Sequence, residues 1–367
     1  MVSLTTALAV AVIGGSQYVG AAPTSLKSLN QAFLRAAQEI RRHQNPDGSW
    51  ATLSTPHPQF QAPFSPHVNV FVPSLIVDLL EPVAHDAGLT DVVDRGRSFL
   101  RQQIEDTGLV RYMGKRGQPG QPGVAPPGCE TPADSDDTAL VWRLAPGHDA
   151  TLLQSARRVL EHYRTADGLY KTWLADEDAH RCFHTKYPGQ EPNPADVGIQ
   201  MHLYLFFVQH DREAAHKLCT ALRPRIGDER IWVWYTMAPL VPLLREAELT
   251  RAGCSIRVPD ARVRRAPPGQ QPYIRLGQRL AEILLGQEPR DIGKSLETLG
   301  SFAGENLTRI EKSPPLLYHN DLSWPSSEAG YYWSEEVGYA LWLRTYVELA
   351  RRQPGRLSLP GRSGRPS

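Results

Sequence analysis

Apolar residues recur every three to four positions along almost the whole chain, and this spacing restricts the fold more than any other feature. The stretch 26–42 shows it well, with Leu29, Phe33, Ala36 and Ile40 on one face of a helix. No run alternates with a period of two for long enough to predict a sheet. Similar spacing predicts further helices over 70–84, 89–103, 137–144, 150–164, 195–209, 212–222, 231–249, 272–285, 291–303 and 334–352.

Short related elements stand between successive helices. They cover 44–50, 105–110 and 165–170, with a weaker copy at 320–324. Each has an acid or amide, usually a glycine, and then a large apolar residue. We expect the glycine to stop the C-terminus of a helix in the left-handed conformation and the apolar residue to pack into the core. Self-similar helical hairpins of this kind predict an all-α chain, with about six pairs closed into an α/α toroid.

The expected domain is a single unit over 26–352. Residues 1–25 carry no charged side chain, and 8–13 are apolar, so this segment is either an outer helix or a signal peptide. The apolar run is too short to span a bilayer. Residues 353–367 are expected to be a disordered tail.

The charge balance gives no global field that would indicate binding to nucleic acid or to an anionic surface. The chain has 40 basic and 39 acidic residues, so no net field favours nucleic acid. Four cysteines, Cys129, Cys182, Cys219 and Cys254, form no C-x-x-C pair. Their even number permits disulfides without predicting them at this chain length. A cluster of acids, imidazoles and a thiol over 176–184 is interpreted as a solvated loop, and we predict neither a metal site nor a cofactor.

Three carboxylates crowd into four positions at Asp134, Asp136 and Asp137. A Gly- and Pro-rich loop precedes them, and the apolar stretch 138–142 follows, so they open a helix beside apolar surface. Crowding and desolvation there would raise carboxyl pKa values, as a general acid requires. The alternative is an ordinary helix N-cap, whose dipole would lower the pKa. The two interpretations therefore predict opposite shifts.

The run Asp-Ser-Asp-Asp-Thr-Ala at 134–139 resembles the D-x-D-D-T-A motif of class II terpene cyclases, the group that includes squalene–hopene cyclases. Gln44, Gly48 and Trp50 resemble the core of their repeated Q-x-x-x-G-x-W element. The resemblance implies an α/α barrel and protonation of an isoprenoid double bond or epoxide. It assigns the general acid to Asp136 and makes Asp134 and Asp137 its orienting neighbours.

The resemblance also implies a histidine that hydrogen-bonds the acid, for which His202 is our candidate. Larger relatives have two or three helical domains, whereas this chain has room for one, which leaves the substrate open. A carbocation needs a dry pocket with aromatic faces. We expect substrate contacts from some of the aromatic side chains and a purely structural role for more than half of them. The candidates are Trp142, Trp173, Phe206, Phe207, Trp232, Trp234, Tyr235, Tyr331, Tyr332 and Trp333.

The predicted function is therefore a terpenoid or meroterpenoid cyclase, an isomerase or lyase acting on a linear polyprenyl substrate. Two alternatives stay open: a glycan-active toroid enzyme with paired carboxylates, and a non-catalytic helical-repeat module that binds lipid or protein. We expect a hydrophobic isoprenoid ligand, no nucleic acid, and a cytoplasmic location. Contact with a membrane surface and export through an N-terminal signal are left as alternatives, and the sequence does not indicate an oligomeric state.

Overall fold

The structure, a computed structural model, describes residues 25–115, 131–147, 149–176, 193–287, 292–320, 330–354, 356–357 and 359. These residues are mostly helical, and most of their buried apolar side chains form one continuous core, beside which Ala238, Leu316, Tyr331 and Trp333 form a small second cluster. The proposed N-terminal segment, nearly all of the loops over 114–133 and 175–194, and most of the tail lie outside the described residues. Among those that are described, no helix has the length and apolarity needed to cross a membrane.

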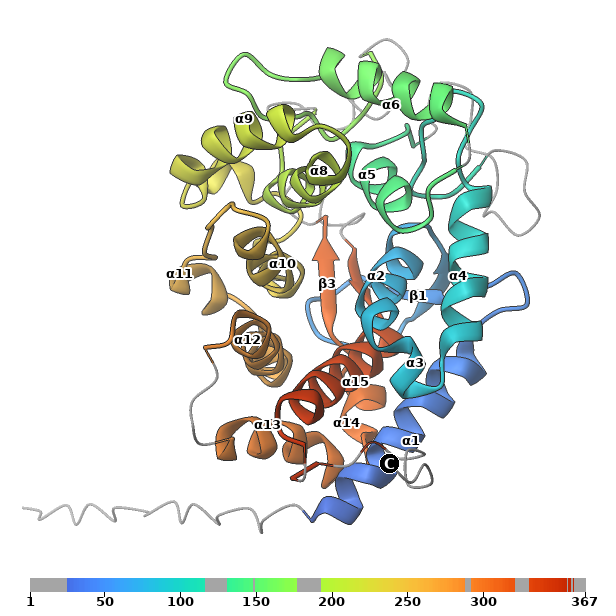
Figure 1. Ribbon diagram of the computed structural model, residues 1–367, viewed down its shortest axis with the longest axis vertical. Helices are drawn as coiled ribbons and strands as arrows, with labels where there is room; N and C mark the ends of the chain where they lie inside the picture. Colours follow the sequence, from blue (N-terminus) through green and yellow to red (C-terminus); the bar gives the residue numbers. More distant parts are fainter. Residues whose placement is uncertain are drawn as a thin grey trace, which may run out of the picture.

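Helices that contact one another in succession form a closed ring, because the last of them also packs against the first. Figure 1 shows this ring around the centre of the molecule. Its members are buried along most of their length, since they face neighbours, the interior and an outer layer. They are α2 (Phe71–Leu80), α5 (Ser135–Leu144), α8 (Val197–His210), α10 (Leu240–Arg251), α12 (Gln271–Leu285) and α15 (Glu335–Arg352).

Amphipathic helices cover the outside of the ring (Figure 1). Each packs against the ring helix nearest to it, as α9 does on α8 and α1 on α15. The outer layer comprises α1 (Leu26–His43), α4 (Thr90–Gln102), α6 (Ala150–His162), α9 (Arg212–Leu222) and α13 (Gly293–Ala303). Short helices complete the described fold: α3 (Ala84–Ala87), α11 (Asp260–Val263), α14 (Thr308–Lys312), η1 (Glu81–Val83), η3 (Arg223–Arg225), η4 (Glu229–Ile231) and η5 (Pro268–Gln270).

The turns that follow outer helices α1, α4 and α6 are built alike. In each, the first residue donates its N–H to a carbonyl four residues on, and the glycine N–H donates back to the first residue. Gly48, Gly108 and Gly168 all have φ between 84° and 95°. A Cβ on Gly48 would lie 2.3 Å from the carbonyl oxygen of Arg95 in α4, and one on Gly108 would lie 2.2 Å from that of Leu152 in α6. The repeat expected from the sequence is therefore also a repeat of structure, because each turn packs against the next outer helix. Of the fourth copy, only Asn320 is described.

A four-stranded antiparallel sheet corrects the expectation of an all-α chain. Its order is β2-β1-β4-β3, and Leu53 in β1 pairs with Trp333 in β4. Sequence periodicity missed these strands because each is only three to five residues long. The central pair also joins segments from opposite ends of the chain. The strands are β1 (Ala51–Thr55), β2 (Ser65–Val68), β3 (Leu316–His319) and β4 (Tyr331–Trp333).

The predicted helix over 231–249 begins late, at Leu240. Residues 232–239 form an irregular loop that enters the interior, and Pro239 immediately precedes the first helical residue. Backbone N–H groups of this loop donate to a side chain of another element, Asp196, instead of to helical carbonyls. The loop is therefore stabilised by a long-range contact that helical periodicity could not reveal.

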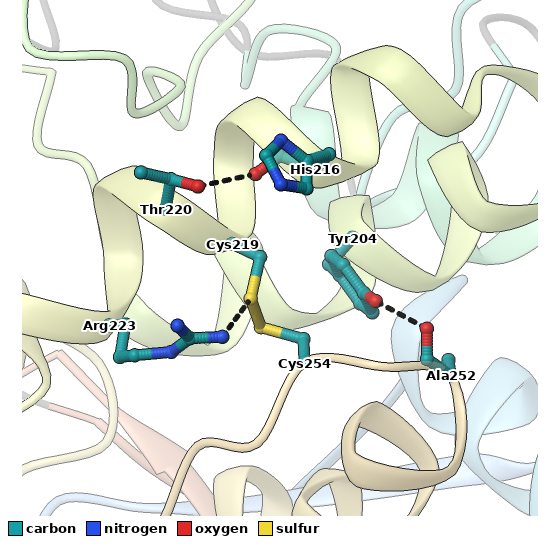
Figure 2. Close-up of a disulfide and its surroundings, with 7 residues drawn as sticks. All are labelled: Tyr204, His216, Cys219, Thr220, Arg223, Ala252 and Cys254. Atoms are coloured by element: carbon teal, nitrogen blue, oxygen red, sulfur yellow. Dashed lines mark hydrogen bonds between the residues drawn. A yellow bond between two sulfur atoms is a disulfide. The ribbon is translucent and has the colours of Figure 1, made fainter.

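A disulfide joins Cys219 of α9 to Cys254, which follows α10 (Figure 2). The two cysteines are 35 positions apart, and both are buried. Close by, the Tyr204 hydroxyl of α8 donates to the carbonyl of Ala252 at 2.7 Å. The cross-link therefore fastens both ends of the segment that contains the 232–239 loop. Cys129 and Cys182 lie outside the described residues.

Candidate active site

The start of α5 is held by contacts that place its acids at the interior. Asp134 is the N-cap, and its side chain accepts the N–H of Asp137 at 2.6 Å. Thr138 accepts the N–H of Val110 at 3.0 Å, which ties the helix to the Gly108 turn. Ser135 donates its N–H to the carbonyl of Thr172 at 2.9 Å. The acidic run is thus fixed between two repeat turns, and all three acids are at most 8% exposed.

A cavity of about 440 Å³ lies beside these acids. The volume falls within the range of small-molecule sites. Asp134, Asp136 and Asp137 all line it, and half of the other lining residues are aromatic. No Lys or Arg belongs to the lining formed by the described residues. The aromatic part of the wall is Phe71, Tyr112, Trp173, Trp234, Tyr235, Tyr318 and Tyr332.

Asp136 is held by one neighbour at each carboxyl oxygen. Nδ1 of His202, in α8, makes a short hydrogen bond with Oδ1 of Asp136. The Tyr235 hydroxyl donates to Oδ2 at 3.4 Å. Burial and the nearby carboxylates raise the pKa of Tyr235 well above its usual range, so this phenol keeps its proton. Tyr235 comes this close because Gly198 of α8 has no side chain, and a Cβ there would lie 2.2 Å from the ring.

In the described part of the chain, the His202 ring has no hydrogen-bond acceptor for a proton on its second nitrogen. The ring is fully buried, and its Nε2 has no hydrogen-bond partner in the described part of the chain. An unpaired buried N–H would carry a larger desolvation penalty than a bare nitrogen lone pair. The tautomer with its proton on Nδ1 therefore fits the site, and His202 donates that proton to Asp136.

The pKa values of the flanking acids move upward. Burial, followed by the charge of Asp136, raises the pKa of Asp134 to about 7. Burial, followed by the charges of Asp134 and Asp136, raises the pKa of Asp137 well above its usual range. The cap geometry expected for a helix start is present, and its N–H bonds do lower the pKa of Asp134. Desolvation and crowding outweigh that effect because the helix begins inside the molecule.

Asp196 fixes the loop that carries Trp234 and Tyr235. It is the N-cap of α8 and accepts the N–H of Gly198 at 2.8 Å. Its other oxygen accepts the N–H groups of Val233 at 2.8 Å and Trp234 at 3.0 Å. Burial raises the pKa of Asp196 to about 7 in spite of these bonds. One side chain thus aligns the helix of His202 with the loop of Tyr235.

The structure brings only some of the expected aromatic residues to the cavity. Trp173, Trp234, Tyr235 and Tyr332 line it, and the ring centroids of the two tryptophans are 6.2 Å apart. The other six candidates lie outside the lining and are buried. Trp142 donates to the Gly108 carbonyl, Trp232 to that of Ile226, Trp333 donates to the Thr55 hydroxyl, and Phe206 packs on Phe207.

Several lining residues were not predicted from the sequence. His67 comes from β2, Phe71 from α2, Tyr112 from the turn after α4, and Tyr318 from β3. Each stands in a short strand, a turn or a helix start without a local pattern of its own. They meet at the cavity because the sheet packs against α2 and the turn after α4. No signal in the sequence indicates this long-range contact.

Solved structures share this arrangement of elements. Type II terpene cyclase MstE from Scytonema, in its apo form, aligns with a TM-score of 0.53 at 13% identity, over 89% of this chain and 99% of that one. A variant of MstE in complex with geranylgeranyl dihydroxybenzoate, its substrate, aligns with 0.51 at 14% identity over the same shares. Another variant, in complex with the product merosterolic acid A, gives 0.52 at 15% over those shares. No family model and no curated protein sequence matches the chain. The likeness is one of fold: this chain has the fold of the type II terpene cyclases.

Proposed function

We propose that this chain is a class II-type terpenoid or meroterpenoid cyclase, in which Asp136 protonates a linear polyprenyl substrate and so starts an intramolecular ring closure. One observation carries the proposal. The Asp136 carboxyl lines an aromatic cavity, and hydrogen-bond donors stand at both of its oxygens. The closed ring of helices supports the α/α barrel interpretation, and such chemistry belongs to the isomerases or lyases.

The first step needs an acid whose conjugate base is stabilised. The alkene π electrons form a C–H bond with the carboxyl proton, which leaves a tertiary carbocation and the Asp136 carboxylate. His202 and Tyr235 both donate to that carboxylate, so its charge is shared at the moment it forms. The next double bond of the substrate then attacks the cation and closes a ring.

The cavity wall suits a cation that has to survive until the next bond forms. Phe71, Trp173, Trp234 and Tyr332 offer aromatic faces instead of nucleophiles. A desolvated cation gains about 2 kcal/mol from one such face, so several are required. Phe71 is buried and the other three are half-buried, so this wall offers little room for the water that would capture the cation early.

The lining favours a substrate with an uncharged head group. A diphosphate requires cationic partners, and the described lining offers neither Lys nor Arg. Ser54 and Asn320 can instead hydrogen-bond hydroxyl groups. A prenylated aromatic compound without a charged group, or a free terpenoid, fits better. Geranylgeranyl dihydroxybenzoate, bound by MstE, is a prenylated aromatic compound that also carries a benzoate.

Replacing the acid tests the proposal. We expect Asp136→Asn to abolish cyclisation of linear C15 to C30 prenyl substrates, because the amide has no acidic proton to give. The shape of the side chain is kept, and the Tyr235 hydroxyl can accept from the new Nδ2–H while His202 still donates to the oxygen. The substrates include free prenols and geranylgeranyl dihydroxybenzoate, and products are identified by mass spectrometry. The loss expected from removing a general acid is on the order of 100-fold or more.

The matched control is Asp106→Asn, because the Asp106 side chain is fully exposed and pairs only loosely with Lys115. This control should cyclise the substrate at the wild-type rate. Circular dichroism establishes that both variants are folded. Retained turnover in folded Asp136→Asn would remove Asp136 as the acid.

A further inference from the structure

A chain of polar side chains crosses a second wall of the cavity, formed by the sheet and the α4 turn. The Tyr318 and Tyr112 hydroxyls share a short hydrogen bond, and the Tyr112 hydroxyl lies 3.0 Å from Nε2 of His67. All three side chains line the cavity. The chain therefore connects the interior of the cavity to a half-buried imidazole on the edge strand β2.

Asn69 fixes the direction of these hydrogen bonds. Its Oδ1 accepts the N–H of Val72 at 2.9 Å, so its Nδ2 is the group that faces Tyr112. That Nδ2 donates to the Tyr112 oxygen at 2.9 Å. The Tyr112 proton is consequently free to point to His67, and the Tyr318 hydroxyl then donates to Tyr112.

His67 is placed to accept a proton. Its Nδ1 faces the carbonyl oxygen of Ser65 at 3.5 Å, so the N–H belongs on Nδ1 and the lone pair on Nε2. Burial lowers the pKa of His67, which keeps the ring neutral near pH 7. The ring nitrogen that meets Tyr112 is therefore an acceptor, and the hydrogen bonds run from Tyr318 through Tyr112 to His67.

We infer that this chain, Tyr318 to Tyr112 to His67, takes up the proton that ends the cyclisation; the inference rests on the proposed function above. A C–H bond beside the final cation breaks, and its electron pair forms the C=C bond of the product. The proton passes to the Tyr318 oxygen, the Tyr318 proton to Tyr112, and the Tyr112 proton to Nε2 of His67. The resulting imidazolium releases a proton to water, and no oxidant or co-reactant is needed.

Separate walls for the acid and the base would give the enzyme control of the product. Burial favours the protonated form of both flanking carboxyls, because it raises both of their pKa values. The Asp136 carboxylate is engaged by His202 and Tyr235 once it has formed. Removing the proton at the second wall selects one C–H bond by its position, and so fixes where the double bond appears.

The test separates the start of the reaction from its end. We expect His67→Gln and Tyr112→Phe to consume substrate at rates within about tenfold of wild type, because Asp136 still starts the reaction. The ratio of the main alkene product to alcohols, alkene isomers and partly cyclised products should fall by about tenfold or more. Gas chromatography with mass spectrometry measures both quantities, with geranylgeranyl dihydroxybenzoate and geranylgeraniol as substrates.

His85→Gln is the matched control, because the His85 side chain is 91% exposed. Its product ratio should equal that of the wild type. An unchanged ratio in both His67→Gln and Tyr112→Phe would overturn the inference, and so would loss of all substrate consumption in both variants while they remain folded. Consumption of substrate by Asp136→Asn is a different outcome, since it would contradict the proposed acid and not the proposed base.

Discussion

At the residue scale, Asp134 shows how one side chain can be both a helix cap and a protonated acid. It accepts the N–H of Asp137, as an N-cap does. Its pKa nevertheless rises to about 7, because burial and the charge of Asp136 outweigh the helix terminus. The folded protein therefore holds a proton that the unfolded chain releases near pH 4. Stability due to this proton is complete below pH 4 and is lost as the pH rises to about 7.

We expect Asp134→Asn to remove this loss of stability with rising pH, because asparagine caps a helix nearly as well as aspartate and does not ionise. Relative to wild type, the free energy of unfolding of the variant should rise between pH 4 and pH 7. The gain should reach on the order of 3 kcal/mol by pH 8. Urea unfolding at several pH values measures it. A difference between the two proteins that does not vary with pH would contradict the raised pKa.

At the element scale, the glycine turns connect each hairpin to the next. Gly48 and Gly88 both have positive φ, at 95° and 64°. Their surroundings differ, because a Cβ on Gly48 would lie 2.3 Å from a backbone oxygen of α4, whereas a Cβ on Gly88 would meet nothing within 4 Å. The first glycine thus serves both conformation and packing, and the second serves conformation alone.

The pair gives a matched prediction. Gly88→Ala should lower the free energy of unfolding by about 1 kcal/mol, the strain of an alanine in the left-handed region. Gly48→Ala should lower it by on the order of 3 kcal/mol or more, because the turn must also move away from α4. Chemical denaturation of both variants measures the difference. Equal losses would show that the contact between turn and helix does not stabilise the repeat.

At the scale of the whole molecule, a buried ion-pair group connects several helices of the ring. Asp78 of α2 pairs with Arg143 of α5 at 2.8 Å and with Arg245 of α10. Arg344 of α15 donates to the Leu79 carbonyl at 3.3 Å. Burial opposes ionisation of Asp78, but the two guanidinium groups hold its pKa well below the usual range. The group therefore helps to close the ring at α2.

We expect Asp78→Asn to lower the free energy of unfolding by about 4 kcal/mol, because Arg143 and Arg245 both lose the buried Asp78 carboxylate, while Arg245 keeps its pair with Glu248. The exposed pair of Glu213 and Lys217, 2.6 Å apart, supplies the control. Glu213→Gln should change stability by about 0.5 kcal/mol at most. Thermal and urea unfolding measure both variants. A loss for Asp78→Asn no larger than that control would show that the ring closes without this charge.

Local patterns predicted much of the helical fold and part of the site. The expected helix over 212–222 has the same bounds as α9, and that over 26–42 nearly matches α1. The strands were missed because their partners lie far away in the chain, as with Leu53 and Trp333. For the site, the acidic motif located the start of α5, and family resemblance placed His202 beside Asp136. Tyr112, Tyr318 and His67 were missed because they come together only where the sheet packs against the turn after α4.

The sequence by itself determined the features that depend on near neighbours. Helical spacing, positive φ at the turn glycines and a capped acidic helix start all arise within a few residues, so a linear pattern can encode them. The tertiary structure decided the sign of the pKa shift at Asp134, and it decided which aromatic rings face the cavity. Both depend on what surrounds a side chain, because desolvation and long-range contacts arise only when distant segments pack together.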